Sequence, residues 1–123
     1  MRVMGLHVLA EMHDCESVLL NDLGHLEVLV KETASENGLP VEDSVFHQFD
    51  PEGVSGVLII PNASFSLHTW PQNNRVTVDA VACCEDMDLL ALCDALVTKL
   101  GAGSMTTKCS KREIEIGQTA CTA

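Results

Sequence analysis

Aromatic residues are scarce in this chain, whose 123 residues include one Trp, three Phe and no Tyr, or 3% in all. Hydrophobic residues nevertheless make up 46% of the sequence. The core is therefore expected to consist of aliphatic side chains, mainly Val, Leu, Ile and Ala. A chain of this length can build one hydrophobic core but not two, so we expect a single domain.

Basic residues are also few, with 7 Lys and Arg against 18 Asp and Glu, a net charge of −11 and a pI of about 4.6. Nucleic acids and anionic membrane surfaces are recognised through basic patches, so this balance argues against both classes of partner. A cationic or small polar ligand is compatible with it. The alternative interpretation is that the negative charge only keeps the protein in solution.

Long apolar runs are missing as well. No run approaches the roughly 18 residues of a membrane span, and residues 1–10 are apolar without the cleavage pattern of a signal peptide. The chain is therefore expected in the cytoplasm, where its six Cys would be thiols rather than a disulfide framework. No Cys-x-x-Cys spacing occurs, so we expect no structural zinc site, and the role of the Cys83-Cys84 pair stays open.

Two stretches have the apolar spacing of amphipathic helices. In the first, Ser17 is placed to cap the helix, and Gly38 with Pro40 ends it. The second is predicted to start near Asp86 and to end at Gly101. Their apolar stripes, which define one buried face of each helix, are Leu19, Leu23, Leu26 and Val30, and then Leu89, Leu92, Cys93, Leu96 and Leu100.

The other periodic segments predict strands. Residues 54–60 are a continuous apolar run, which predicts a strand covered on both faces. Residues 75–83 alternate between two sets of side chains, as a strand does, and Asn73-Asn74 before them is a hairpin signal. The expected strands are residues 3–11, 44–49, 54–60, 63–70, 75–83 and 111–116.

This order of elements predicts an α+β fold. Two helices would cover an antiparallel sheet, which makes a two-layer sandwich. We expect the domain to span residues 1–116. Residues 117–123 are small and polar, which predicts a frayed tail.

The stretch from Ile60 to Gln72 contains the only Trp of the chain. An apolar strand stops there at a Pro-Asn turn, and the chain then re-enters as an extended run. Side chains two residues apart in a strand share a face, so this run would present two hydroxyls, an imidazole and an indole together. With a thiol one strand away, they can form a site. The four residues are Ser64, Ser66, His68 and Trp70.

Five blocks connect this stretch with a known family. The block His68-Thr69-Trp70-Pro71 lies between residues 49–57 (Phe-Asp-Pro-Glu-Gly-Val-Ser-Gly-Val) and 78–83 (Val-Asp-Ala-Val-Ala-Cys), and it follows 6–11 (Leu-His-Val-Leu-Ala-Glu) and 19–22 (Leu-Leu-Asn-Asp). Together they resemble the bacterial and archaeal S-adenosylmethionine decarboxylases over most of the chain. The resemblance implies the same two-layer fold and a homodimer packed sheet to sheet, with sites at the interface. It also implies a pyruvoyl-dependent decarboxylase that serves spermidine synthesis.

The departure from the family lies where the cofactor forms. Family members carry Glu-Ser-His before His-Thr-Trp-Pro, and this Ser cleaves its own chain to become the pyruvoyl group. Aligned without a gap, the three positions are Asn62, Ala63 and Ser64 here. The reaction needs a hydroxyl that attacks the preceding carbonyl and an oxygen that then leaves Cβ, and Ala63 has neither. Without the pyruvoyl carbonyl, this type of decarboxylase has no electron sink.

The resemblance implies catalytic roles for three residues that are present. Ser55 and His68 resemble the residues that assist self-processing, and Cys83 resembles the residue that reprotonates the product carbon. From the residues alone, other interpretations stay open. Ser55 suits any tight turn, and a Cys at a strand end is commonly a small buried hydrophobe.

Substrate-binding roles are implied for three further residues. Phe49 resembles the aromatic residue that stacks on adenine, although a core Phe is the alternative, and Trp70 belongs to the same predicted site. Gln72 stands where the family has a ribose-binding Glu. An amide still hydrogen-bonds a diol, but without the charge assistance of a carboxylate.

Three functional hypotheses follow. The leading one is a pseudoenzyme without the cofactor that binds S-adenosylmethionine or a related small molecule, as a homodimer or with an active paralogue that it regulates. The second is an active decarboxylase processed at Ser64, which requires a bulge or turn that shifts the register; the alternative is a solvent or turn serine. The third is a structural or interaction module. Cleavage separates the second from the others, and ligand binding separates the first from the third.

Overall fold

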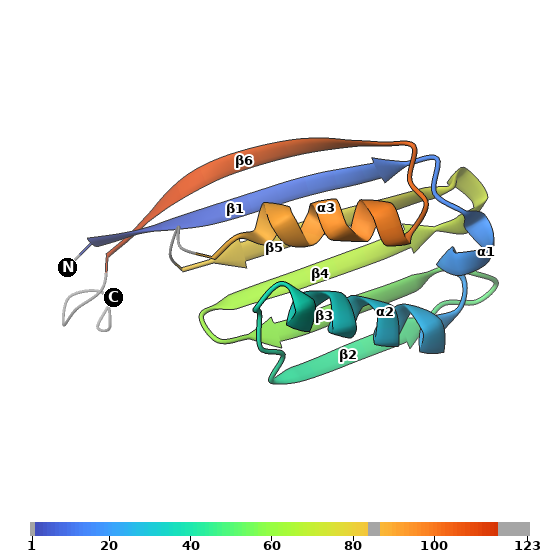
Figure 1. Cartoon of the computed structure of the whole chain (residues 1–123), viewed down its shortest axis with the longest axis horizontal. Helices are drawn as coiled ribbons and strands as arrows, with labels where there is room; N and C mark the ends of the chain where they lie inside the picture. The colour runs from blue at the N-terminus through green and yellow to red at the C-terminus, as the bar shows by residue number, and fades with distance from the viewer. Residues whose placement is uncertain (1, 84–86, 116–123) are drawn as a thin grey trace.

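Six strands form one antiparallel sheet, in the order β2-β3-β4-β5-β1-β6, in the computed structural model, which describes residues 2–83 and 87–115 (Figure 1). The helices lie on one face of this sheet, so the predicted α+β two-layer fold is confirmed. The strands are β1 (Arg2–His13), β2 (Asp43–Gln48), β3 (Val54–Ile60), β4 (Ala63–Trp70), β5 (Arg75–Ala82) and β6 (Ser104–Glu115). The helices are α1 (Ser17–Leu20), α2 (Leu23–Glu36), α3 (Leu89–Lys99) and the 3-10 helix η1 (Pro71–Asn73).

The first helical region divides into two helices instead of one. The long helix α2 is capped by Asp22, whose Oδ1 accepts a 3.1 Å hydrogen bond from the N–H of His25. The predicted cap at Ser17 is therefore wrong, because Ser17 only begins the short α1. Gly38 adopts a φ of +75° directly after α2, which explains why the helix ends there.

The second helix, α3, is capped by Asp88, whose Oδ1 accepts a 2.9 Å hydrogen bond from the N–H of Ala91. The start predicted near Asp86 lies outside the described residues. Gly101, with a φ of +65°, follows the helix as expected. Among the described residues, no helix has both the length and the hydropathy that a membrane crossing requires.

The core lies between the helices and the sheet and is mainly aliphatic, as predicted. Phe65 in β4 is its largest side chain and is fully buried. The predicted alternation of β5 is confirmed, because every second residue faces the helices. These β5 residues are Val76, Val78, Ala80 and Ala82.

The strand β3 does not have both faces covered in the single chain. Leu58 and Ile60 are buried under the helices, whereas Val57 is half-buried and Ile59 is 43% exposed on the opposite face. The predicted two-sided burial is therefore wrong for the chain alone. We call this opposite face, which no helix of the described residues covers, the open face.

The last strand is longer than the sequence indicates. The sequence predicts a strand over residues 111–116, but β6 starts at Ser104 and pairs with β1 along its whole length. Its residues from 106 to 113 are exposed at the edge of the sheet, so they lack the apolar alternation that reveals a half-buried strand. The tail expected at 117–123 lies outside the described residues.

Candidate functional site

A row of polar side chains crosses the open face at right angles to the strands. Each member is the direct register partner of the next. In β1, β3, β4 and β5 the residues on either side of each member are buried against the helices, so alternation places the row on the open face. This polar row consists, from β2 to β6, of His47, Ser55, His68, Thr77, Glu11 and Thr106.

Ser55 and His68 form the centre of the row. The hydroxyl of Ser55 and Nδ1 of His68 are in direct hydrogen-bonding contact. The ring of His68 also contacts two aromatic rings, with centroid distances of 5.3 Å to Phe49 and 4.3 Å to Trp70. Four residues singled out in the sequence thus form one cluster, which we call the aromatic cluster.

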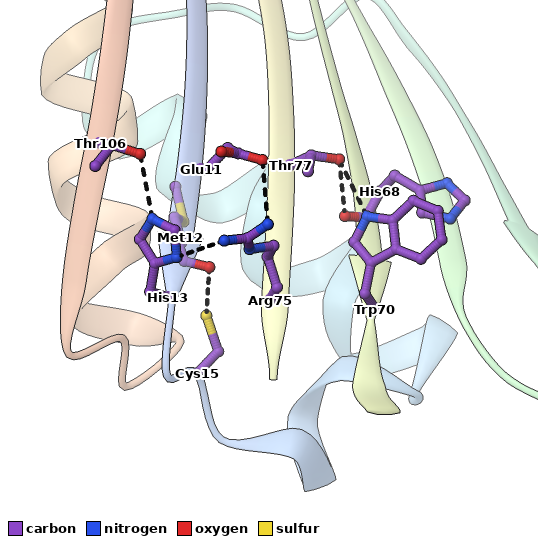
Figure 2. A network of polar contacts seen from close by, with 9 residues as sticks. All are labelled: Glu11, Met12, His13, Cys15, His68, Trp70, Arg75, Thr77 and Thr106. Carbon is purple, nitrogen blue, oxygen red and sulfur yellow. Dashed lines mark hydrogen bonds and ion pairs between the residues drawn. The ribbon is translucent and has the colours of Figure 1, made fainter. Parts of the chain in front are cut away.

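Trp70 is oriented by its neighbour on β5. Its indole Nε1 donates to the hydroxyl of Thr77 over 3.4 Å, and this hydroxyl donates to the backbone oxygen of His68 over 3.4 Å (Figure 2). Both contacts are long for hydrogen bonds of these types. Thr77 therefore favours this orientation of the indole but does not fix it rigidly.

His47 extends the aromatic cluster and was not among the predicted site residues. Its ring packs edge-on against Phe49, with centroids 4.7 Å apart and an interplanar angle of 72°. A signal was present in the sequence, because His47 and Phe49 are two residues apart in the expected strand 44–49 and would share a face.

Thr69 explains how His68 and Trp70 are both held on the open face. It points to the opposite side and is 1% exposed. Its hydroxyl donates to the backbone oxygen of Leu20 at 2.6 Å and accepts from the N–H of Val54 at 2.9 Å. The residue between the two ring-bearing residues thus fastens β4 to α1 and β3.

A second set of hydrogen bonds positions the turn that carries Phe49. Oδ1 of Asn21 accepts from the N–H of Gly53 at 2.9 Å and from Nε2 of Gln48 at 2.7 Å. The N–H of Phe49 donates to the oxygen of Gly53 at 2.7 Å. Gly53 has a φ of +112°, a conformation that a side chain would disfavour. This turn brings the ring of Phe49 beside that of His68.

The residues aligned with the family's processing site lie at the other end of β4. Pro61 and Asn62 form a two-residue turn in which Ile60 pairs with Ala63, and Asn62 has a φ of +63°. The N–H of Cys83 donates to the oxygen of Asn62 at 2.8 Å. Ala63 and His68 are five residues apart in one strand, a separation of roughly 16 Å. The single chain therefore holds the predicted residues in two groups.

Ser64 lies inside a regular part of the sheet. It pairs with Ile59 on one side and Val81 on the other, and both ladders continue without a bulge from Ala63. Its side chain is exposed on the open face. A hydroxyl–imidazole pair with His68 does not form, because the two residues are roughly 13 Å apart along the strand and Nδ1 of His68 contacts Ser55 instead.

Gln72 lies in η1, exposed and directly beyond Trp70 in the chain. Cys83 is exposed next to the Pro-Asn turn, and Cys84 lies outside the described residues. Within residues 2–83 and 87–115, no group of three His, Cys, Asp or Glu side chains is arranged to hold a metal ion.

Two further thiols are structural in character. Burial raises the pKa of the Cys15 thiol, and the nearby Asp14 adds to this effect. Burial, followed by the charges of Asp94 and Cys109, raises the pKa of Cys93 to about 12. Neither thiol can readily form the thiolate that nucleophilic chemistry requires.

A small hollow of about 250 Å³ adjoins the Ser55–His68 contact. Its polar wall includes Ser66, whose hydroxyl donates to the backbone oxygen of Asp79 at 3.0 Å, and the carboxylate of Asp79, which lies 2.7 Å from Nε2 of His7. Hydroxyls, an imidazole and exposed ring faces together suit a flat polar ligand, which rings can stack on and hydroxyls can orient.

The comparisons of sequence and of structure all match this chain to the same family of proteins. The sequence model described as S-adenosylmethionine decarboxylase matches residues 6–113. The S-adenosylmethionine decarboxylase proenzyme of Acetivibrio thermocellus is 35% identical over 114 residues, which cover 93% of this chain and 92% of the relative. The proenzyme of Pelotomaculum thermopropionicum is 37% identical over 114 residues, covering 93% and 90%.

Solved structures share the fold. The crystal structure of the adenosylmethionine decarboxylase from Aquifex aeolicus superposes with a TM-score of 0.82 at 24% identity, over 94% of this chain and 96% of that one. The Trypanosoma brucei AdoMetDC-delta26 monomer gives a TM-score of 0.52 at 14% identity, over 85% of this chain and 44% of that one.

Proposed function

The chain belongs to the S-adenosylmethionine decarboxylase family, and from this premise we propose that it is a member that cannot form the pyruvoyl cofactor and instead binds S-adenosylmethionine or a related small molecule. The observation that carries the proposal is the side chain at position 63. In the gap-free alignment with the family's pattern, Ala63 occupies the position of the serine that becomes the cofactor, and Ala63 has no oxygen on Cβ. The pyruvoyl group therefore does not fit the residues of this chain.

The surroundings of Ala63 support this interpretation. Processing at Ser64 would need a shifted register, and the uninterrupted ladders on both sides of β4 argue against such a shift. Ser64 is also separated from the imidazole of His68 by roughly 13 Å along the strand. An active decarboxylase processed at Ser64 is thus the weaker hypothesis.

A binding function is supported by the aromatic cluster. Phe49 and Trp70 are each 40% exposed, which is unusual for large rings that a core would otherwise bury. Both keep contact with His68, whose Nδ1 is fixed by Ser55. We assign Phe49 and Trp70 to stacking on a flat ligand group, and Gln72 to a polar contact beyond Trp70.

The open face supports a partner chain. Apolar side chains on it remain exposed over several strands, and an apolar patch of this kind marks an interaction surface. We propose that it packs against the same face of a second copy or of an active paralogue, which the bound pseudoenzyme would regulate. This would also bring residues of the two separated groups from different chains to one interface. The most exposed apolar residues of this face are Leu9, Val45, Phe49, Ile59 and Trp70.

The deciding measurement is the intact mass of the purified protein under denaturing conditions, followed by calorimetry with S-adenosylmethionine. We expect one species at the full 13.3 kDa and saturable binding. The Acetivibrio thermocellus relative, named a proenzyme, is the control for cleavage. Two fragments that divide between Ala63 and Ser64, the second blocked at its N-terminus, would mean that Ser64 forms the pyruvoyl group, and the proposal would then be wrong. An intact chain that binds no ligand would leave the interaction module.

A further inference from the structure

A second and larger pocket opens beside Trp70, at the end of the open face away from Ala63. Its volume is about 580 Å³, which lies within the range of small-molecule sites. The strand ends of β1, β4 and β5 and the helix η1 form its wall. The lining side chains that matter for its chemistry are Glu11, His13, Asp14, Trp70, Asn73 and Arg75.

Arg75 is the cation of this pocket, and its partners leave it unsaturated. Its Nη2 lies 3.1 Å from Nδ1 of His13, and its Nη1 lies 3.6 Å from Oε1 of Glu11, too long for a close hydrogen bond (Figure 2). These are the side-chain partners of this guanidinium in the part of the chain that the structure describes. A guanidinium has five N–H donors, so most of them stay available to a ligand.

His13 is a hydrogen-bond acceptor for Arg75 in this arrangement. Arg75 can only donate, so Nδ1 of His13 has to be the acceptor and carries no proton. The proton is then on Nε2, which lies 3.2 Å from the hydroxyl of Thr106 and donates to it. The charges that line the pocket are therefore one guanidinium and the carboxylates of Glu11 and Asp14.

The wall that carries Asp14 is held in place by backbone hydrogen bonds. The residue before it, His13, accepts from the N–H of Gly103 at 2.8 Å, and the residue after it, Cys15, donates to the oxygen of Asn74 at 2.8 Å. Asp14 itself has a φ of +56° and an exposed side chain. The backbone that carries this carboxylate is thus held in place, and Asp14 and Arg75 line the same pocket. A backbone that is already ordered lowers the entropy cost of binding a ligand.

We propose that this pocket binds the α-amino acid group of a ligand, with the carboxylate on Arg75, the ammonium on Glu11 and Asp14, and the adjoining chain against the indole of Trp70. A ligand with only negative charge would meet two carboxylates, and a ligand with only positive charge would meet the guanidinium. A zwitterion satisfies both signs. The ligand class rests on the proposed function, since S-adenosylmethionine carries such a group and Trp70 belongs to both the pocket and the aromatic cluster.

The fluorescence of Trp70 gives a direct test, because it is the only Trp in a chain without Tyr. The full-length protein is titrated with L-methionine and with its decarboxylated analogue, a primary amine with the same thioether chain. We expect saturable binding of methionine, about tenfold weaker binding of the amine, and loss of about tenfold in methionine affinity in Arg75→Gln. Arg75→Lys should lose less, because it keeps the charge but not the fork. Lys99→Gln, which removes a charge paired with Glu36 on the helical side, should bind as the unchanged protein does.

Each other outcome overturns the inference. Equal binding of the amine, or tighter binding of it in Arg75→Gln, would make the pocket a cation site. No response of Trp70 to methionine, or equal affinities in all variants, would remove the site. The proposed function fails separately. If S-adenosylmethionine binds and its affinity is unchanged in Arg75→Gln, only this inference is wrong. If methionine binds through Arg75 but S-adenosylmethionine does not bind, the proposed function is wrong.

Discussion

The N–H of Cys83 donates a 2.8 Å hydrogen bond to the carbonyl oxygen of Asn62, the residue that directly precedes Ala63. Asn62 itself has a φ of +63° in its two-residue turn. A donor on this oxygen draws electron density from the carbonyl carbon, as donors do at acyl-transfer sites. The carbonyl before Ala63 thus has a hydrogen-bond donor in place, while the side chain of Ala63 has no hydroxyl that could attack this carbonyl.

Replacement of Ala63 by Ser is expected to give a chain that cuts itself. The substitution supplies the missing oxygen next to the Asn62 carbonyl, and intact-mass measurement under denaturing conditions would show two fragments that divide between residues 62 and 63. Ser64→Ala is the matched control and should stay intact, like the unchanged chain. A variant Ala63→Ser that remains whole would show that the peptide lacks more than the hydroxyl.

Thr69→Val should destabilise the fold strongly, although the two side chains have nearly the same shape. The buried oxygen of Leu20 and the N–H of Val54 lose their partner, and each loss costs about 1–3 kcal/mol. Thermal or urea unfolding measures the change. Thr77→Val loses only the two 3.4 Å contacts and should cost less than about 1 kcal/mol. Equal losses of unfolding free energy in both variants would contradict the role of Thr69 in connecting β4 with α1 and β3.

Gly56→Ala should destabilise the protein by about 1–3 kcal/mol, because the new methyl group would overlap the ring of Phe46 and come within 2.7 Å of its Cζ. Gly24→Ala is the comparison. There the methyl group would meet Oδ1 of Asp22 at 3.8 Å in a helix, so we expect stabilisation by up to about 1 kcal/mol. The second substitution Phe46→Leu should recover part of the loss at Gly56. Similar melting temperatures for both Gly variants would refute this account.

Thiol labelling should distinguish the buried from the exposed cysteines. At about pH 8 the native protein should react at Cys83 and Cys109 but not at Cys15 or Cys93, as peptide mapping would show. Because burial raises the pKa of Cys93 from 9.0 to about 12, the folded chain holds this proton more tightly. The stabilisation is complete below pH 9.0 and is lost as the pH rises toward 12. Labelling of Cys93 as fast as Cys109 without denaturant would show that α3 opens readily.

Ile59→Glu should separate the proposed pair of chains without unfolding them. Ile59 is 43% exposed on the open face, so the carboxylate is tolerated in one chain but buried in the pair. Light scattering after size exclusion should give twice 13.3 kDa for the unchanged protein and 13.3 kDa for the variant. Val28→Glu, on the exposed side of α2, should remain paired. An unchanged protein that runs as a single chain at micromolar concentration would remove the proposed interface.

The sequence predicts best where one face of an element is buried. Alternation in residues 75–83 identifies β5, and the apolar stripe of the second helix identifies α3. When one face of an element is buried, apolar residues recur with the period of a strand or a helix. The sequence predicts only the last part of the edge strand β6, since exposed residues carry no such period. The sequence predicts Ser17 as the cap of the first helix, whereas Asp22 caps α2. Ser and Asp are both favourable N-cap residues, so local sequence does not decide between the two positions, and the tertiary structure does.

The candidate site was predicted in part. The shared face of His68 and Trp70 follows from their spacing, and the structure adds the contact with Ser55 from the neighbouring strand. The pocket at Arg75 could not be predicted, because its wall joins strand ends and a turn that are distant in the sequence. Local patterns do not encode which strand ends become neighbours, and only the sheet order does so.

The sheet order has a consequence for any break between Asn62 and Ala63. Residues before the break supply β2 and β3 at one edge, but they also supply β1, which lies between β5 and β6 of the second segment. The two segments are interlocked, and neither can leave without opening ladders on both sides of β1. The two fragments of a cut chain would therefore stay together and elute as one folded species in size exclusion under native conditions. By the same topology, the two segments, expressed as separate polypeptides, are suited to assemble into the intact fold by complementation.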